Sequence, residues 1–168
     1  MLYYCNYNSP LGEMTLMSDG CSLIGVWFVG QRHYPQYDFS NLVCKQDAIL
    51  QYTQSWLDSY FSGKNPGLFA IPLNPAGTEF QKLVWSNLLN VSYGSSISYG
   101  QIADFVRVQK GCDKMAARAV GAAVGRNPIS IIIPCHRVMG RHGTLTGYAG
   151  GLTIKAQLLN IENICFVE

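Results

Sequence analysis

The sequence has few charged residues and no long apolar run. Charged residues make up 13% of the 168 positions and hydrophobic residues 48%. This balance excludes an intrinsically disordered chain, which needs low hydrophobicity and high charge. The longest apolar stretch, residues 129–134, is interrupted by Ser130 and is far shorter than the roughly 18 residues of a membrane span. The first residues lack the basic and apolar regions of a signal peptide, so we expect a cytoplasmic protein that does not act at a membrane.

The sequence also lacks paired cysteines and clustered histidines. Its six cysteines are scattered, and no two are spaced as Cys-x-x-Cys, which argues against a disulfide framework or a zinc ribbon. Cys5, Cys21 and His33 form the one plausible trio of metal ligands, but no second histidine lies near them in the sequence. Since zinc sites usually need four ligands, we expect no metal, and no other cofactor is indicated.

The net charge of +2 hides an uneven distribution along the chain. Residues 1–81 hold three Lys and Arg against six Asp and Glu, a net charge of −3, whereas residues 82–168 hold nine against four, a net charge of +5. A basic half beside an acidic half points to a polyanionic partner on one side. Many housekeeping enzymes share such a split, so the charge alone does not identify the partner.

The first half of the chain has the pattern of a small sheet and one helix. Apolar or alternating runs predict strands over residues 2–7, 13–18 and 23–29, separated by turn-forming residues. Apolar residues at near-helical spacing predict a helix over 47–61. The Pro-rich stretch 67–75 is the best candidate for a linker, so we expect an N-terminal lobe over residues 1–75.

The second half is predicted to be mainly helical. Helices are expected over residues 79–90, 99–106, 114–125 and 152–163, with Thr78, Ser98 and Asp113 capping the first three; Ser98 and Gln101 match a capping box. A tight turn at 109–113 between two of these helices suggests a helix-turn-helix. We therefore predict an α+β protein, with a small N-terminal lobe of β-meander and helix and a mainly helical C-terminal lobe over residues 76–168.

The most informative stretch surrounds Cys135. A buried strand is expected over 129–133, ending at Pro134, and it is followed by Cys135, His136 and Arg137. Neighbouring positive charge lowers the pKa of a thiol, and an imidazole can act as its base. The sequence therefore predicts a nucleophilic Cys135 with a pKa below that of free cysteine, whereas the other cysteines are interpreted as structural. Adjacent side chains point apart in regular structure, so His136 would need a turn or a bridging water to reach the thiol.

The run Pro134-Cys-His-Arg-Val138 resembles the active-site signature of the O6-alkylguanine-DNA alkyltransferases. Further stretches resemble family motifs in the family's order: 97–103, 116–121, 127–128 and 147–152. The resemblance is strong over residues 78–162 and loose in the N-terminal lobe, where Ser9-Pro-Leu-Gly12 carries it. It implies DNA repair by direct, irreversible and stoichiometric transfer of an alkyl group to Cys135. The source would be O6-alkylguanine in duplex DNA, with O4-alkylthymine left open as a second substrate. The protein would act as a monomer and without a cofactor.

The resemblance also implies roles for individual residues. Cys135 would be the nucleophile, Tyr99 would give a proton to the departing guanine, and His136 and Glu162 would draw the thiol proton away through water. Arg118 would enter the base stack when the damaged base is flipped out. Asn127 would be a hinge between the recognition helix and the active site. Arg137 would brace the structure rather than react.

Two sets of residues complete this assignment. Those expected at the DNA are Arg118, Asn127, Ala117, Lys114 and Arg126, and those expected to line the base pocket are Tyr148, Val138, Ser130, Thr146 and Ala149. Ser130 stands where some members carry proline, and Thr146 and Ala149 replace residues found in other members. These departures affect which bulky alkyl groups fit and leave the type of reaction unchanged.

Three other functions remain open from the sequence. A non-catalytic alkyl-DNA binding protein of the same family would lack the nucleophile that Cys135 supplies. A helix-turn-helix regulator would not need the Pro-Cys-His-Arg run or Tyr148. A Cys–His hydrolase would need an oxyanion hole and turnover with water, and no further motif supports one.

Overall fold

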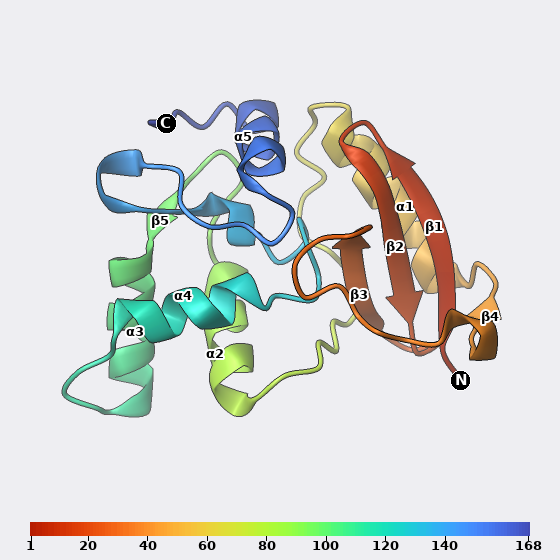
Figure 1. Cartoon of the computed structure of the whole chain (residues 1–168), viewed down its shortest axis with the longest axis horizontal. Helices are drawn as coiled ribbons and strands as arrows, with labels where there is room; N and C mark the ends of the chain where they lie inside the picture. The colour runs from red at the N-terminus through yellow and green to blue at the C-terminus, as the bar shows by residue number, and fades with distance from the viewer. The chain divides into compact units, whose positions relative to one another are not determined.

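The computed structural model describes residues 1–168, apart from the side chain of Asn41. The chain divides into two compact units. One contains Met1–Ala76 together with Pro128–Ser130, and the other contains Gly77–Asn127 and Ile131–Glu168. The first is built on a sheet and the second mainly on helices (Figure 1), which confirms the predicted α+β class. Among the helices described, none is long and apolar enough to cross a membrane.

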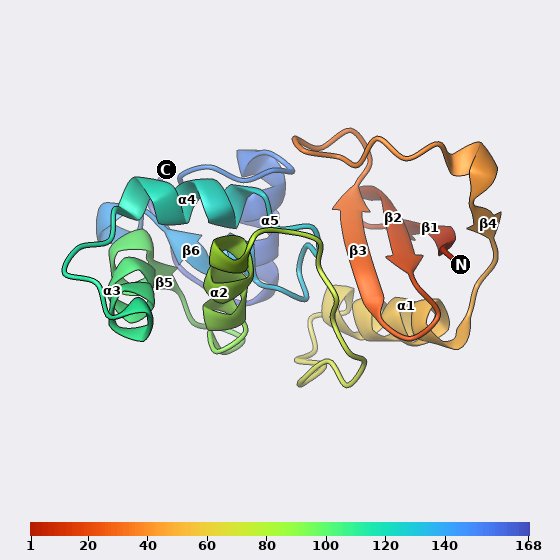
Figure 2. The ribbon, with the colours of Figure 1, turned by 90° about the horizontal axis from the view of Figure 1, so that it is seen from below.

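The N-terminal unit is a four-stranded sheet with one long helix. Strands β1 (Tyr3–Ser9), β2 (Gly12–Ser18) and β3 (Leu23–Phe28) form the expected antiparallel meander. The short β4 (Val43–Cys44), which the sequence pattern did not predict, follows the 3-10 helix η1 (Phe39–Asn41) and pairs with β1 in parallel. Helix α1 (Ala48–Phe61) packs against β1 and β2 and lies along one face of the sheet (Figure 2). Its N-cap, Asp47, accepts a hydrogen bond from the Leu50 amide.

The C-terminal unit contains four helices and a two-stranded parallel sheet. The helices are α2 (Glu79–Leu88), α3 (Tyr99–Lys110), α4 (Ala117–Gly125) and α5 (Leu152–Ile161), and the strands are β5 (Ile97–Ser98) and β6 (Val138–Met139). Helices α2, α3 and α4 pack against one another, and the Trp85 indole donates a hydrogen bond to the Ala123 carbonyl at 2.8 Å. Met139 of β6 packs with Leu159 and Ile164, which fixes α5 against the strand that follows Cys135.

Two of the three predicted helix caps are confirmed. Thr78 and Ser98 each form a complete capping box, with Gln81 and Gln101 respectively. The third prediction is wrong, because α4 begins at Ala117 and its N-cap, Ala116, has no capping side chain. Helix α3 is also longer than expected, and it ends where Gly111 adopts a left-handed conformation with φ of 63°.

The predicted buried strand over residues 129–133 is wrong as well. The segment is buried, but it forms turns, and only Ile129 makes an isolated bridge, to Val26. Ile131 has φ of 71°, which is uncommon for a β-branched residue and breaks the extended path. A short apolar run shows that a segment is buried without showing whether it is extended or turned.

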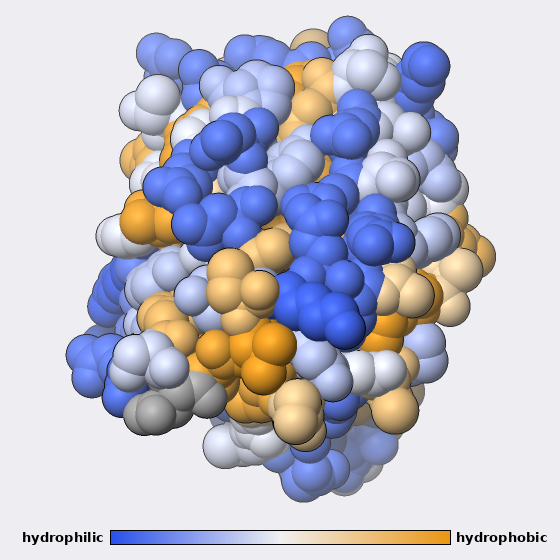
Figure 3. Space-filling model, turned by 90° about the vertical axis from the view of Figure 1, so that its right-hand side faces the viewer, coloured by the Kyte–Doolittle hydropathy of each residue, from blue (hydrophilic) through white to orange (hydrophobic). Residues whose placement is uncertain are grey.

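The surface mixes hydrophilic and apolar side chains. Figure 3 shows a face that is largely hydrophilic, with apolar side chains gathered over a smaller area. Exposed apolar atoms make up much of any folded protein's surface, so this face alone does not indicate a partner.

Candidate active site

A tight turn places Cys135 at the start of the 3-10 helix η2 (Cys135–Arg137). Pro134 has φ of −82° and ψ of 63°, and the Cys135 amide donates a hydrogen bond to the Ile133 carbonyl at 2.8 Å. This is an inverse γ-turn, for which the fixed φ of proline is well suited. Cys135 remains 6% exposed, so the thiol is nearly enclosed by protein.

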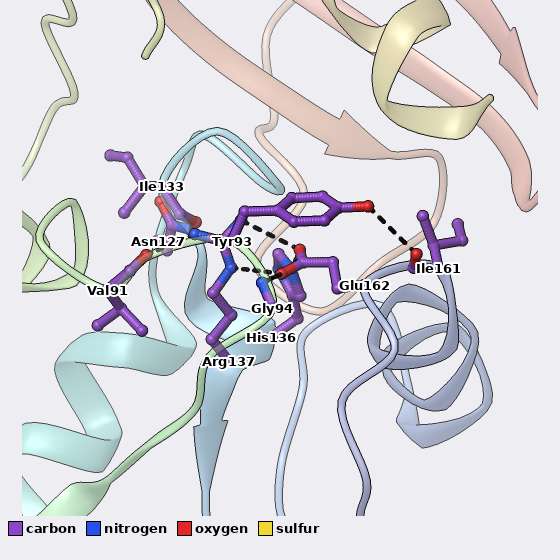
Figure 4. A network of polar contacts seen from close by, with 9 residues as sticks. All are labelled: Val91, Tyr93, Gly94, Asn127, Ile133, His136, Arg137, Ile161 and Glu162. Atoms are coloured by element: carbon purple, nitrogen blue, oxygen red, sulfur yellow. Dashed lines mark hydrogen bonds and ion pairs between the residues drawn. The ribbon is translucent and has the colours of Figure 1, made fainter. Parts of the chain in front are cut away.

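The side chain of Asn127 reaches this thiol. Its Nδ2 donates to the Cys135 sulfur at 3.1 Å and to the Ile133 carbonyl at 2.8 Å, and Figure 4 shows Asn127 beside Ile133. Asn127 lies just beyond α4 and is 4% exposed. The sequence placed it among the DNA-contacting residues, as a hinge. The structure adds a direct contact with the reactive atom.

A buried carboxylate organises the next two residues of the chain. Glu162 Oε1 lies 2.6 Å from His136 Nε2, and Glu162 Oε2 accepts from Arg137 Nε at 2.8 Å and from the Gly94 amide at 3.1 Å (Figure 4). Arg137 Nη2 also donates to Oε1 at 3.1 Å, while its Nη1 donates to the Val91 carbonyl at 2.6 Å. The structure thus brings His136 and Glu162 together as expected, and Arg137 braces the carboxylate.

The contacts of Glu162 and His136 set their protonation. Burial alone would raise the pKa of Glu162, but the hydrogen bonds and charges of His136 and Arg137 lower it to about 2. Burial lowers the pKa of His136 below its ordinary value, against the opposing effect of Glu162. At neutral pH the pair is therefore a carboxylate and a neutral imidazole.

The expected low pKa of Cys135 is not found. Burial raises the pKa of the thiol above its ordinary value, and the Asn127 hydrogen bond and the charge of Lys155 oppose this only in part. The prediction counted the neighbouring cations but not the enclosure of the sulfur, which the sequence does not reveal. The thiol is consequently protonated at neutral pH in the free protein, and its proton has to leave as the reaction begins.

Tyr99, the first residue of α3, faces the loop that follows β6. Its hydroxyl donates to the Thr146 carbonyl at 3.3 Å, and a Cβ at Gly121 of α4 would lie 3.6 Å from the Tyr99 ring. Burial raises the pKa of Tyr99, so the hydroxyl keeps its proton. The half-buried Tyr148 and Ala149 belong to the same loop.

The sequence analysis missed Lys155. This lysine lies in α5 with an exposed fraction of 0%, and its Nζ donates to the carbonyls of Val138 at 2.6 Å, Thr146 at 2.7 Å and Gly147 at 3.3 Å. It shares the buried face of α5 with Leu158 and Leu159. This spacing could have identified Lys155 from the sequence, because a lone lysine on the apolar stripe of a helix is unusual.

The other predicted residues lie elsewhere. Ala117 and Arg118 are exposed in the first turn of α4, with Lys114 and Arg126 exposed before and after the helix. Val138 is buried in β6. Ser130 belongs to the N-terminal unit, where its hydroxyl lies 3.5 Å from Gln31 Oε1, so the structure gives it a partner in the sheet unit rather than among the residues around Cys135.

A cleft of about 520 Å³ opens beside the N-terminal turn of α3. Its lining includes Ser98, Gln101 and Met139 together with the 3-10 helix η3 (Arg141–Gly143). Among the described residues, no three His, Cys, Asp or Glu side chains converge as metal ligands. Cys5 is buried in β1 and Cys21 is exposed.

Two family models cover almost the whole chain. One, described as 6-O-methylguanine DNA methyltransferase, ribonuclease-like domain, matches residues 2–75, and the other, the DNA binding domain of the same description, matches residues 79–164. Among curated relatives, the methylated-DNA–protein-cysteine methyltransferase of Haemophilus influenzae is 40% identical over 99% of this chain and 89% of its own length. The constitutive protein of that name from Bacillus subtilis is 39% identical over 100% of this chain and 99% of its own.

Solved structures give the same result. The O6-methylguanine methyltransferase of Mycobacterium tuberculosis matches with a TM-score of 0.82 at 39% identity, over 96% of this chain and 93% of that one. The crystal structure of Mycobacterium tuberculosis OGT in complex with DNA matches with a TM-score of 0.81 at 38% identity, over 95% of this chain and 92% of that one.

Proposed function

Because this chain belongs to the 6-O-methylguanine DNA methyltransferase family, we propose that its Cys135 accepts the alkyl group of an O6-alkylguanine in duplex DNA. DNA is its partner, and the reaction is a repair that restores the guanine directly. The observation that carries the assignment to Cys135 is the geometry around its sulfur. The Asn127 amide lies 3.1 Å away, and the next residue, His136, lies 2.6 Å from a buried carboxylate.

The reaction is a displacement at carbon. The Cys135 sulfur attacks the alkyl carbon, a sulfur–carbon bond forms, and the bond from that carbon to guanine O6 breaks. The thiol proton passes to His136 through water, and the departing guanine takes a proton from the Tyr99 hydroxyl. His136 then loses its extra proton to water and Tyr99 regains one from water, so no proton is gained or lost overall. The resulting thioether has no hydrolytic exit, so each molecule accepts one alkyl group and stops. The substrate carries the group and the thiolate attacks it, so no cofactor is required.

The buried carboxylate fixes which nitrogen of His136 acts as the base. With Glu162 ionised, the neutral imidazole carries its proton on Nε2 and donates it to Oε1, which leaves Nδ1 as the basic nitrogen. Arg137 and the Gly94 amide occupy the remaining acceptor sites of Glu162. The carboxylate therefore orients and stabilises the imidazole without itself taking the proton.

The exposed residues around α4 suit the DNA side of the reaction. The damaged base has to leave the stack to reach a buried sulfur, and Arg118, which is exposed on the first turn of α4, would fill the gap. The small side chains of α4, including Ala117, allow close approach to the groove, and Lys114 and Arg126 would contact phosphates. Tyr148, Thr146 and Ala149 would form the wall of the base pocket, with Val138 beneath it. We propose that the protein acts as a monomer.

A transfer assay tests this function. Wild-type protein and Cys135→Ala are incubated with a duplex that carries one O6-methylguanine labelled on its methyl group, and the label on the protein is counted. The wild type should take up the label, whereas the variant should take up none and still bind the duplex with nearly the same affinity. Label on Cys135→Ala would contradict the proposal. A duplex labelled elsewhere on the guanine is the control.

A further inference from the structure

The reaction as described leaves one buried charge without a role. Lys155 is wholly buried, and its described hydrogen-bond partners are the three carbonyl oxygens of Val138, Thr146 and Gly147. Among the ion pairs of the described residues, the buried carboxylate of Glu162 belongs to His136 and Arg137. Buried ammonium groups are normally paired with an anion, so this one needs a counter-ion.

The thiolate that forms at Cys135 is an anion whose charge interacts with that of Lys155. The charges of Lys155 and Cys135 act on each other, and Lys155 also acts on His136. Once the thiol proton has passed through His136 to solvent water and the imidazole is neutral again, the site holds two buried anions, the thiolate and Glu162, against two buried cations, Arg137 and Lys155. Removing Lys155 would leave one buried negative charge in excess, which is costly in a site of low dielectric constant.

We propose that Lys155 is a positioning residue for the alkyl transfer, whose ammonium balances the Cys135 thiolate and holds the Thr146–Gly147 loop to β6. This inference rests on the proposed function. The hydrogen bonds described for Lys155 go to carbonyl oxygens and not to the Cys135 sulfur, so the lysine acts through the field at Cys135 and through the three carbonyls.

The contact between Lys155 and the Thr146–Gly147 loop also bears on Tyr99. The Thr146 carbonyl accepts from Lys155 Nζ at 2.7 Å and from the Tyr99 hydroxyl at 3.3 Å. When Tyr99 turns its proton toward a guanine, Lys155 still satisfies that carbonyl. The lysine thereby keeps the loop in place while the tyrosine acts as proton donor.

The titration of Lys155 gives the inference a pH signature. The groups around Lys155 are the carbonyls named above, the titratable side chains of Cys135 and His136, whose charges interact with it, and Tyr99, which shares the Thr146 carbonyl. Burial lowers the pKa of Lys155 to about 8, against the opposing effect of Cys135. The ammonium is therefore present below that pH and is lost as the pH rises through it. Because the thiol pKa lies above that of Lys155, the gain in thiolate is offset by the loss of ammonium above pH 8, and the transfer rate should rise with pH and then level off near pH 8.

The test compares Lys155→Met and Lys155→Arg with wild type and with Lys82→Met, an exposed lysine of α2 that loses the same charge. The rate of transfer from a free O6-alkylguanine base is followed across pH, with thermal melting as the measure of folding. Lys155→Met should be about tenfold slower at neutral pH, which corresponds to a rise of about one unit in the thiol pKa. Lys155→Arg should keep the neutral rate, and its rate should continue to rise above pH 8 where that of the wild type levels off. Lys82→Met should match wild type.

Two results would overturn the inference. One is a folded Lys155→Met with the wild-type rate and pH profile, and the other is a rate that levels off near pH 8 in Lys155→Arg as it does in wild type. If Lys155→Met does not fold, the arginine variant decides alone. A second measurement needs no substrate. The absorbance of the Cys135 thiolate is followed across pH in wild type and in each Lys155 variant, and the absorbance of the same protein carrying Cys135→Ser is subtracted. The difference should show a higher Cys135 pKa without the lysine even if the proposed transfer itself fails.

Discussion

The Asn127 amide is the one side-chain donor described at the Cys135 sulfur, and it also satisfies the Ile133 carbonyl. Asn127→Ala should therefore lower both reactivity and stability. Leaving the buried carbonyl unsatisfied costs roughly 1–3 kcal/mol, and the thiolate loses a hydrogen bond that favours it. Chemical denaturation measures the first effect, and the rate of transfer from a free O6-alkylguanine base measures the second.

Asn87→Ala is the matched control for that experiment. Asn87 is 7% exposed, and its Nδ2 donates to the Leu83 carbonyl and to Gln109, at 2.8 Å in both cases. This variant should lose similar stability and keep its transfer rate. If both asparagine variants slow the transfer equally, the Asn127 contact has no special role at the thiol.

The Glu162 carboxylate should make stability depend on acidity. Its pKa is about 2 in the folded protein and about 4.3 in the unfolded chain, so its contribution is full above that second value. The contribution is lost as the pH falls toward 2 and amounts to about 3 kcal/mol. The free energies of unfolding of wild type and Glu162→Gln, measured by chemical denaturation at a series of pH values, should therefore approach each other as the pH falls toward 2. Asp104→Asn, at an exposed position, is the control and should show the pH dependence of wild type. A constant difference in unfolding free energy between wild type and Glu162→Gln across this range would disprove the assignment.

At the scale of single residues, the sequence predicted which side chains carry the chemistry better than it predicted the surroundings of those side chains. Cys135, His136 and Glu162 were found because thiol, imidazole and carboxylate carry recognisable chemistry in a known motif. The pKa of Cys135 was predicted in the wrong direction, and Lys155 was overlooked. Both depend on burial by residues distant in the chain, which local spacing does not show.

At the scale of elements, α3 and α4 with the turn between them carry the exposed cations Lys110, Lys114 and Arg118. Arg118→Ala should leave transfer from a free base unchanged and slow the repair of duplex DNA, because the proposed role of Arg118 is to hold the flipped state. Arg107→Ala, which removes an α3 arginine paired with Asp104 at 3.8 Å, is the control and should affect neither rate. Equal losses on free base and duplex in Arg118→Ala would show that Arg118 does not act on base flipping.

The helix caps show what local sequence can predict about elements. Thr78 and Ser98 were identified correctly because a capping box is a short-range device whose partners lie three residues apart. Asp113 has the right side chain, but α4 starts four residues later, at Ala117. The segment at 129–133 was predicted as a strand, and the left-handed Ile131 turns it instead. Tertiary packing determines whether such a segment is extended or turned, and the local sequence pattern does not show which.

At the scale of the whole molecule, the uneven charge predicts where phosphates are bound. Residues 82–168 carry a net charge of +5 and residues 1–81 a net charge of −3. Duplex affinity should fall with salt, with a log–log slope near −0.9 for each phosphate neutralised. Neutralising Lys114 or Arg126 should flatten that slope, whereas neutralising Lys45 or Lys64, both exposed in the N-terminal unit, should not. An equal effect of the N-terminal lysines would place the DNA on a different surface.

The central claim is that this molecule transfers one alkyl group to Cys135 and then stops. The most direct measurement is intact mass spectrometry, with peptide mapping, after incubation with an excess of duplex containing O6-methylguanine. We predict a single increase of about 14 Da, as a methyl group replaces the thiol hydrogen, located in the peptide that contains Cys135, and no repair beyond one lesion per protein. Methylation of another cysteine, or continued repair by an unmodified protein, would contradict the account.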